Sequence, residues 1–147
     1  PIASTMFPII AKRKAAKEKY INVFLIAILT TSLIAVGITV FYWLFPNIAI
    51  GVLFGKDYLS ARTDLIWMGI FMTFYSLSNL VVNFYLSIGN TKVVYIPLLA
   101  AIAQIVSIWF YHNSITQVLH SSLYVTAGMF LCLVTFTGYN LFAENRK

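Results

Sequence analysis

Long apolar stretches separated by short polar clusters make up most of this chain. No Asp, Glu, Lys or Arg occurs between Tyr20 and Gly55, and none occurs between Val93 and Ala143. A helix of about 20 mostly apolar residues is long enough to span the hydrocarbon core of a membrane. The pattern therefore predicts an all-α integral membrane protein.

Three breaks divide the apolar stretches into four predicted spans. Pro46 suits the first turn of a new helix, Gly89-Asn90 is a strong turn pair, and a polar cluster follows Tyr111. The predicted spans cover about 20–45, 64–88, 92–111 and 115–142, with an external corner at 46–62.

The two ends of the chain flank this four-helix transmembrane domain, 20–142. The first ten residues, PIASTMFPII, are apolar and precede a basic run, whereas a signal peptide has its charges first. We expect 1–19 to be the tail of a preceding helix and a basic cytoplasmic loop, and 143–147 to be a cytoplasmic tail. The chain is then a fragment, or the C-terminal part, of a longer membrane protein.

Composition and charge exclude two other classes of protein. Hydrophobic residues make up 61% of the chain and charged residues 10%, against about 25% charged residues in soluble domains. The net charge of +6 does not indicate nucleic-acid binding, because half of the basic residues form one run before a span instead of spreading over a folded face. We predict that this run contacts anionic membrane lipid; it comprises Lys12, Arg13, Lys14, Lys17 and Lys19.

The distribution of basic residues between the loops predicts the orientation. With four spans, 12–19, Lys92 and the C-terminal Arg146-Lys147 pair fall on one side of the membrane, and Lys56 and Arg62 fall on the other. Cytoplasmic loops carry the excess of Lys and Arg. Eight basic residues against two predict a multi-pass protein of the cytoplasmic membrane with both ends of the four-span unit inside.

The segment around Gly51 and Gly55 has a superficial likeness to a phosphate-binding loop. That loop needs four residues between its glycines and a Ser or Thr after its lysine. Here three residues separate the glycines, and Asp57 follows Lys56. We exclude a nucleotide site at this position.

The remaining reactive residues predict no catalytic or metal chemistry. His112 and His120 are eight residues apart without a carboxylate or cysteine between them, which favours capping or interfacial histidines over a zinc site. No acid pair or nucleophile–histidine arrangement is present, so we expect neither an enzyme nor a cofactor. Cys132, the one cysteine, is predicted to be a packed, inert thiol.

Neutral polar residues recur at helical spacing along the second, third and fourth spans. Amides and hydroxyls in hydrocarbon must face a partner or a water-filled cavity. Two interpretations stay open: hydrogen bonds between helices, or a shared cavity for an amphiphilic substrate with a sugar head and a lipid tail. The candidate cavity residues are Ser76, Asn79, Asn83, Gln104, Ser107, Thr126 and Thr137. No Asp, Glu, Lys or Arg lies at mid-depth in a span, so a proton-coupled step would use a residue outside this chain.

Two short motifs resemble a known family. A span ends at Phe45-Pro46, and a segment of the form L-F-G-x-x-Y-x-x-A runs from Leu53 to Ala61, with Gly55 and Tyr58 at the matching positions. The turn Ser87 to Lys92 matches a small-Gly-x-x-Lys turn. Over about residues 5–142 the chain resembles the C-terminal part of polysaccharide flippases in the multidrug/oligosaccharidyl-lipid/polysaccharide superfamily. Gly55 is expected to end the segment after Pro46 in a left-handed turn.

The resemblance implies a two-lobed bundle of twelve or more helices, in which this chain supplies most of the second lobe. It implies alternating access that moves a lipid-linked oligosaccharide or polysaccharide precursor to the outer leaflet, with the missing N-terminal lobe as the partner. The alternatives are a multidrug exporter lobe, a non-transporting assembly subunit and a membrane transferase fragment. Exporters tend to carry acidic residues within their spans, and this chain has none at mid-depth there.

Overall fold

The structure, a computed structural model, describes residues 2–16, 20–53, 55 and 62–144, and every element in them is a helix. Four helices are long and apolar enough to cross a membrane, so the prediction of an all-α membrane chain is confirmed. The elements are α1 (Ile2–Ala15), α2 (Ile21–Leu44), α3 (Pro46–Leu53), α4 (Arg62–Ser87), the 3₁₀ helix η2 (Thr91–Val94), α5 (Tyr95–Phe110) and α6 (Ile115–Glu144).

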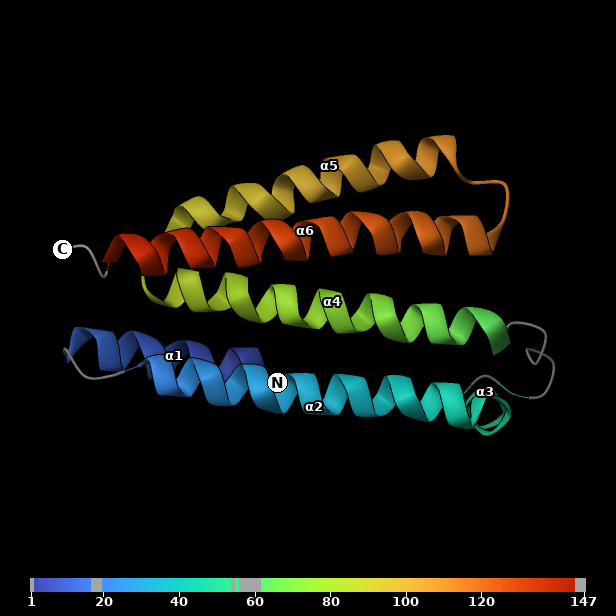
Figure 1. Cartoon of the computed structure of the whole chain (residues 1–147), viewed down its shortest axis with the longest axis horizontal. Helices are drawn as coiled ribbons and strands as arrows, with labels where there is room; N and C mark the ends of the chain where they lie inside the picture. Colours follow the sequence, from blue (N-terminus) through green and yellow to red (C-terminus); the bar gives the residue numbers. More distant parts are fainter. Residues whose placement is uncertain (1, 17–19, 54, 56–61, 145–147) are drawn as a thin grey trace.

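The long helices lie side by side and alternate in direction (Figure 1). α4 occupies the centre and packs against α1, α2, α3, α6 and η2, whereas α5 packs against α6 and η2. α5 lies on the far side of α6 from α4 (Figure 1). This order decides which polar faces can meet.

The alternation gives the bundle two distinct ends (Figure 1). The basic end holds the last turn of α1, with Lys12, Arg13 and Lys14, and the α4–η2 turn, with Lys92. The corner end holds α3 and the turn between α5 and α6. The described basic residues therefore collect at the ends as the four-span topology requires, with Arg62 at the corner end.

Backbone chemistry explains where the helices stop. Pro46 is the first residue of α3, a position where a missing N–H breaks no hydrogen bond. The predicted left-handed turn at Gly55 is confirmed, since its φ is 91° and its N–H donates to the Ile50 carbonyl (3.0 Å). Gly89, with φ 77°, ends α4 in the same region of φ, and the Asn90 N–H donates to the Tyr85 carbonyl (2.9 Å). The rest of the predicted corner, Phe54 and residues 56–61, lies outside the described residues.

Aromatic contacts hold the bundle together in its basic-end half. Phe24 of α2 stacks on Phe84 of α4 with ring centroids 3.9 Å apart, and Tyr85 meets Phe136 of α6 edge-on at 5.1 Å. Met6 and Ile10 of α1 are buried in the same cluster. Such pairs contribute about 0.5–1.5 kcal/mol each beyond their buried area.

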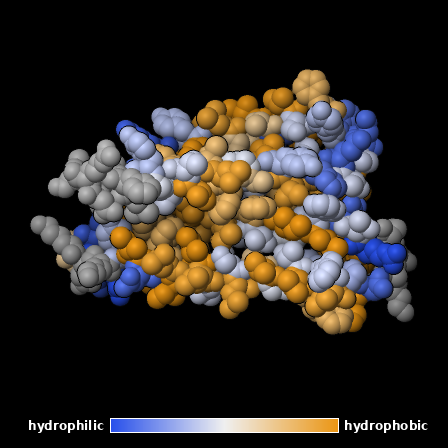
Figure 2. Space-filling model, viewed as in Figure 1, coloured by the Kyte–Doolittle hydropathy of each residue, from blue (hydrophilic) through white to orange (hydrophobic). Residues whose placement is uncertain are grey.

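The outer surface of the spans is apolar. On the face seen in Figure 2, hydrophobic residues cover the middle of the molecule and hydrophilic residues gather at both ends. Leu33, Trp109 and Tyr139 are each at least three-quarters exposed. A soluble protein does not leave an apolar surface of this extent in water, whereas lipid tails cover it in a multi-pass membrane protein.

Candidate functional site

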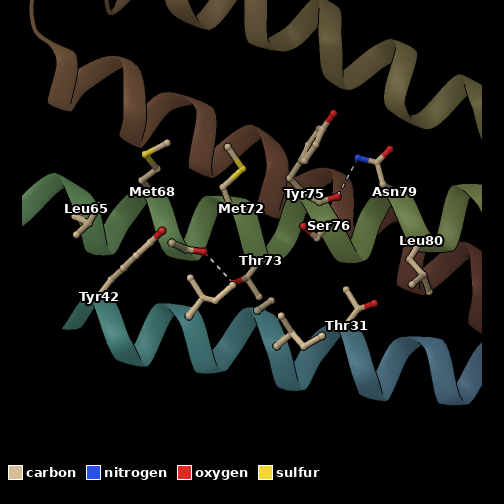
Figure 3. A pocket seen from close by; sticks show the side chains of 14 residues that line it. Thr31, Tyr42, Leu65, Met68, Met72, Thr73, Tyr75, Ser76, Asn79 and Leu80 are labelled. Carbon is tan, nitrogen blue, oxygen red and sulfur yellow. Dashed lines mark hydrogen bonds between the residues drawn. The ribbon is translucent and has the colours of Figure 1, made fainter. Parts of the chain in front are cut away.

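A groove of about 640 Å³, partly open to the outside, is lined by residues of α2 and α4 (Figure 3). Most of its wall is apolar, and no charged residue lines it. Methionine and tyrosine side chains of α4 form one wall, and aliphatic side chains of α2 form the other. The lining residues are Thr31, Ile34, Ala35, Ile38, Tyr42, Leu65, Met68, Gly69, Met72, Thr73, Tyr75, Ser76, Asn79 and Leu80.

Helical periodicity places the α2 side of this groove on one face. Thr31, Ala35, Ile38 and Tyr42 follow one another at intervals of four, three and four residues, which is the spacing of a single helix face. The groove runs along the spans because α2 and α4 are antiparallel neighbours. It therefore lies at the depth of the hydrocarbon core.

A close contact between the two helices forms the floor of the groove. Gly69 is buried, and a Cβ atom at this position would lie 3.1 Å from Thr39 Oγ1 and 3.3 Å from a ring carbon of Tyr42. The Thr39 and Thr73 hydroxyls lie 3.1 Å apart across the contact. Each hydroxyl also lies 2.9 Å from the carbonyl four residues before it. A hydroxyl has one hydrogen, so a threonine that donates to the carbonyl of its own helix can only accept across the interface.

Two of the polar groups in the groove have unused hydrogen-bonding capacity, although the Thr31 hydroxyl oxygen is shielded from solvent. The buried Thr31 Oγ1 has no hydrogen-bond partner within the described part of the chain. Asn79 Nδ2 donates to the Tyr75 carbonyl (3.3 Å), which uses one of its two hydrogens and leaves Oδ1 as an acceptor. Figure 3 shows Asn79, Tyr75, Met72 and Met68 along the same side of α4. An apolar groove with a few hydrogen-bonding groups suits an amphiphilic molecule.

The second-span candidates form one continuous polar stripe on α4. Ser76 and Asn79 line the groove. Asn83 follows one turn later, and its amide donates to the Asn79 carbonyl (2.8 Å). The stripe leads from the groove toward the basic end.

The third-span candidates lie at a different interface. Gln104 Nε2 donates to Ser122 Oγ (3.2 Å), and Ser107 Oγ donates to Ser121 Oγ (3.0 Å). Both bonds join α5 to α6, and both serines of α6 are buried. For these two residues the structure matches the interpretation of hydrogen bonds between helices.

The fourth-span candidates do not reach the groove either. Thr126 is buried within the bundle at 3% exposure, and Thr137 Oγ1 donates to the Leu133 carbonyl of its own helix (2.8 Å). Of the seven candidates, Ser76 and Asn79 line this groove. For the α5 candidates the reason is the order of the helices, since α6 stands between α4 and α5 (Figure 1).

Sequence reasoning missed the contribution of α2. The candidates from the sequence lie on the other three spans and include no residue of α2, although Thr31 and Tyr42 share the face described above. Met68 and Tyr75 of α4 are not among the candidates either, which are Asn, Gln, Ser and Thr residues. The four–three–four spacing from Thr31 to Tyr42 was the available signal.

The described part of the basic run lies in the last turn of α1. Lys14 Nζ donates to the Ile88 carbonyl at the end of α4, where a positive charge also stabilises the negative end of the helix dipole. Lys12 and Arg13 are exposed beside it. Lys17 and Lys19 lie outside the described residues. Contact of the run with anionic lipid stays a prediction.

The two histidines and the cysteine lie on helix ends and surfaces. His112 Nδ1 contacts the Trp109 carbonyl and His120 Nδ1 contacts the Thr116 carbonyl, both at 2.8 Å. Among the described residues, no three His, Cys, Asp or Glu side chains come together. Cys132 is exposed on α6, so the prediction of a packed thiol is wrong. α6 turns this position outward, whereas Leu133 beside it is fully buried.

Comparison with known proteins finds no relative. No protein-family model, no curated protein and no solved structure matches the chain. Arguments about function therefore start from the membrane-spanning helices and the groove between α2 and α4.

Proposed function

We propose that this chain is part of a flippase, a transporter that moves lipid-linked oligosaccharide or polysaccharide precursors across the cytoplasmic membrane by alternating access. The main evidence for this proposal is the groove between α2 and α4. It combines apolar walls with the Ser76 hydroxyl and the Asn79 amide. A lipid tail can pack against the apolar walls, and sugar hydroxyls can form hydrogen bonds with the polar groups.

The absence of charge from the groove lining argues against a cationic cargo. No charged residue is among the lining residues, and a cation would need a carboxylate or an aromatic cage to replace its hydration. The polar stripe Ser76–Asn79–Asn83 continues from the groove toward the basic end, as a path for a sugar head requires. These features favour a glycan precursor over the organic cations of a multidrug exporter.

The resemblance of the corner and turn motifs supports the same family. On this proposal a second helical lobe faces the open side of the groove, and the two lobes rock about the cargo. The basic end faces the cytoplasm, and the corner end faces outward.

A transport assay with a matched pair of variants tests the proposal. The native protein that carries this sequence is reconstituted in liposomes with a fluorescent short-chain lipid-linked oligosaccharide, and a membrane-impermeant quencher reports the fraction in the outer leaflet. We expect Asn79→Leu to slow flipping by about 3- to 10-fold, the equivalent of one lost hydrogen bond of about 0.6–1.4 kcal/mol.

Asn140→Leu is the control. Asn140 also donates to the carbonyl four residues before it (2.7 Å), but it lies on α6 outside the groove lining. Its flipping rate should stay within twofold of the parent. Equal slowing by both variants, or no flipping by the parent protein, contradicts the proposal. Transport of organic cations instead of the glycan would identify a multidrug exporter.

A further inference from the structure

The short helix α3 runs across the end of the bundle instead of along it. Figure 1 shows α3 almost end-on, whereas α2 and α4 extend along the view. α3 begins at Pro46, directly after Phe45, so the chain changes direction where the first span ends. Because the spans cross the membrane, a helix at a steep angle to them lies close to the membrane plane.

One face of α3 is fixed to the spans. Ala49 and Ile50 are buried in a cluster with Leu65 of α4 and Tyr42 of α2, and α3 contacts both of these helices. This packing sets the rotation of α3 about its own axis. It therefore decides where the other side chains of α3 point.

The remaining surface of α3 divides into two flanks of different character. Asn47 and Gly51 lie four residues apart on one flank, and Ile48 and Val52, also four residues apart, form the other. All four residues are exposed, and α3 contains no charged residue. Ile48 and Val52 are 56% and 78% exposed, so the described residues leave this apolar flank mostly uncovered.

Two tryptophans mark the depth of α3 in the membrane. Trp43 lies in the last turn of α2 and Trp109 in the last turn of α5, both at the corner end, and both side chains are exposed. Tryptophan rings concentrate at the boundary between hydrocarbon and water. α3 begins three residues after Trp43, so it starts at this boundary. Leu44 and Phe45, between Trp43 and α3, are exposed as well, so the lipid-facing surface of α2 continues to α3.

We propose that the flank formed by Ile48 and Val52 docks into the interfacial layer of the membrane at the corner end. The partner is the lipid itself, at the level where headgroups meet acyl chains. The two apolar side chains enter this layer, Asn47 and Gly51 face water, and the buried face holds the helix on α2 and α4. The docking fixes the ends of these two spans at one depth. It goes beyond the proposed transport function, because it holds whatever the cargo is.

Spin labels on the two flanks test this docking. In a cysteine-free background that includes Cys132→Ala, the native protein that carries this sequence receives Val52→Cys or Gly51→Cys, is labelled with a nitroxide and is reconstituted in phosphatidylcholine vesicles. Power-saturation EPR compares collisions with oxygen, which concentrates in lipid, and with a water-soluble nickel chelate. No atom lies within 4 Å of a Cβ at Gly51, so a side chain fits at this control position. We expect the oxygen-to-nickel ratio to be at least about threefold higher at position 52 than at position 51.

Three further labels decide between the outcomes. Ile48→Cys and Asn47→Cys repeat the comparison one turn earlier, and Leu33→Cys, on the exposed apolar surface of α2, gives the ratio for the hydrocarbon core. The ratios at Ile48 and Val52 should fall between those at Leu33 and Asn47. The proposal is overturned if both flanks collide equally with nickel, since α3 then lies in water. It is also overturned if positions 48 and 52 are shielded from both reagents, since a protein surface then covers the flank.

Discussion

Amide and hydroxyl side chains in the spans satisfy their hydrogen bonds in two main ways. Asn83, Thr137 and Asn140 donate to the carbonyl four residues before them, and Gln104 and Ser107 donate to another helix. The buried hydroxyls of Thr31 and Ser78 do neither within the described part of the chain. A buried hydroxyl without a partner costs about 1–3 kcal/mol, so each of these two positions carries a penalty of that size.

Cysteine accessibility tests whether the groove contains water. Cys132→Ala removes the exposed native thiol, and Asn79→Cys is then treated with a charged, membrane-impermeant thiol reagent. Because only a hydrated thiol ionises and reacts, we expect labelling of Asn79→Cys at least tenfold faster than of Leu131→Cys, which is 63% exposed on the apolar surface of α6. Equal labelling rates at the two positions would show that the groove is exposed to lipid and not to water.

At the scale of elements, small residues decide how closely two helices approach. Gly69 allows Thr39 and Tyr42 to lie within van der Waals contact of the α4 backbone, and the Thr39–Thr73 contact follows from that approach. The α5–α6 pair uses serines in the same way, with Ser107 and Ser121 in contact. Membrane helices associate through such close contacts because lipid supplies no hydrophobic driving force between them.

Gly69→Ala measures the closeness of the α2–α4 contact. The added Cβ would lie 3.1 Å from Thr39 Oγ1, so the threonine must move, at a cost of about 1 kcal/mol. We expect the melting temperature in detergent to fall by about 2–4 °C. Gly37→Ala on α2, where no atom lies within 4 Å of the new Cβ, should leave it unchanged or higher. A fall of the same size in both variants would refute a specific contact at Gly69.

At the scale of the whole molecule, the alternation of helices separates a basic end from a corner end (Figure 1). Lys12, Arg13, Lys14 and Lys92 lie at the basic end. Basic residues near an anionic leaflet contribute about 1 kcal/mol each. This bias favours the basic end in the cytoplasm.

Labelling from one side of intact cells tests the orientation. With Cys132→Ala in place, Ser114→Cys at the corner end should react with an impermeant reagent outside, and Asn90→Cys at the basic end should react only after permeabilisation. Neutralising Lys12, Arg13 and Lys14 with glutamine removes about 3 kcal/mol of the bias and should raise external labelling of Asn90→Cys. The reverse pattern in the parent would contradict the charge argument.

The sequence by itself determined the all-helical membrane class, the positions of the four spans, and the turns at Pro46, Gly55 and Gly89. These features depend on local chemistry: apolar length, a missing N–H, and a backbone with positive φ. The tertiary structure alone decided which polar faces meet. Periodicity puts Ser76 and Asn79 on one face and Gln104 and Ser107 on another, but it does not say which neighbour each face meets. Because α6 separates α4 from α5, the first pair lines the groove and the second pair joins two helices.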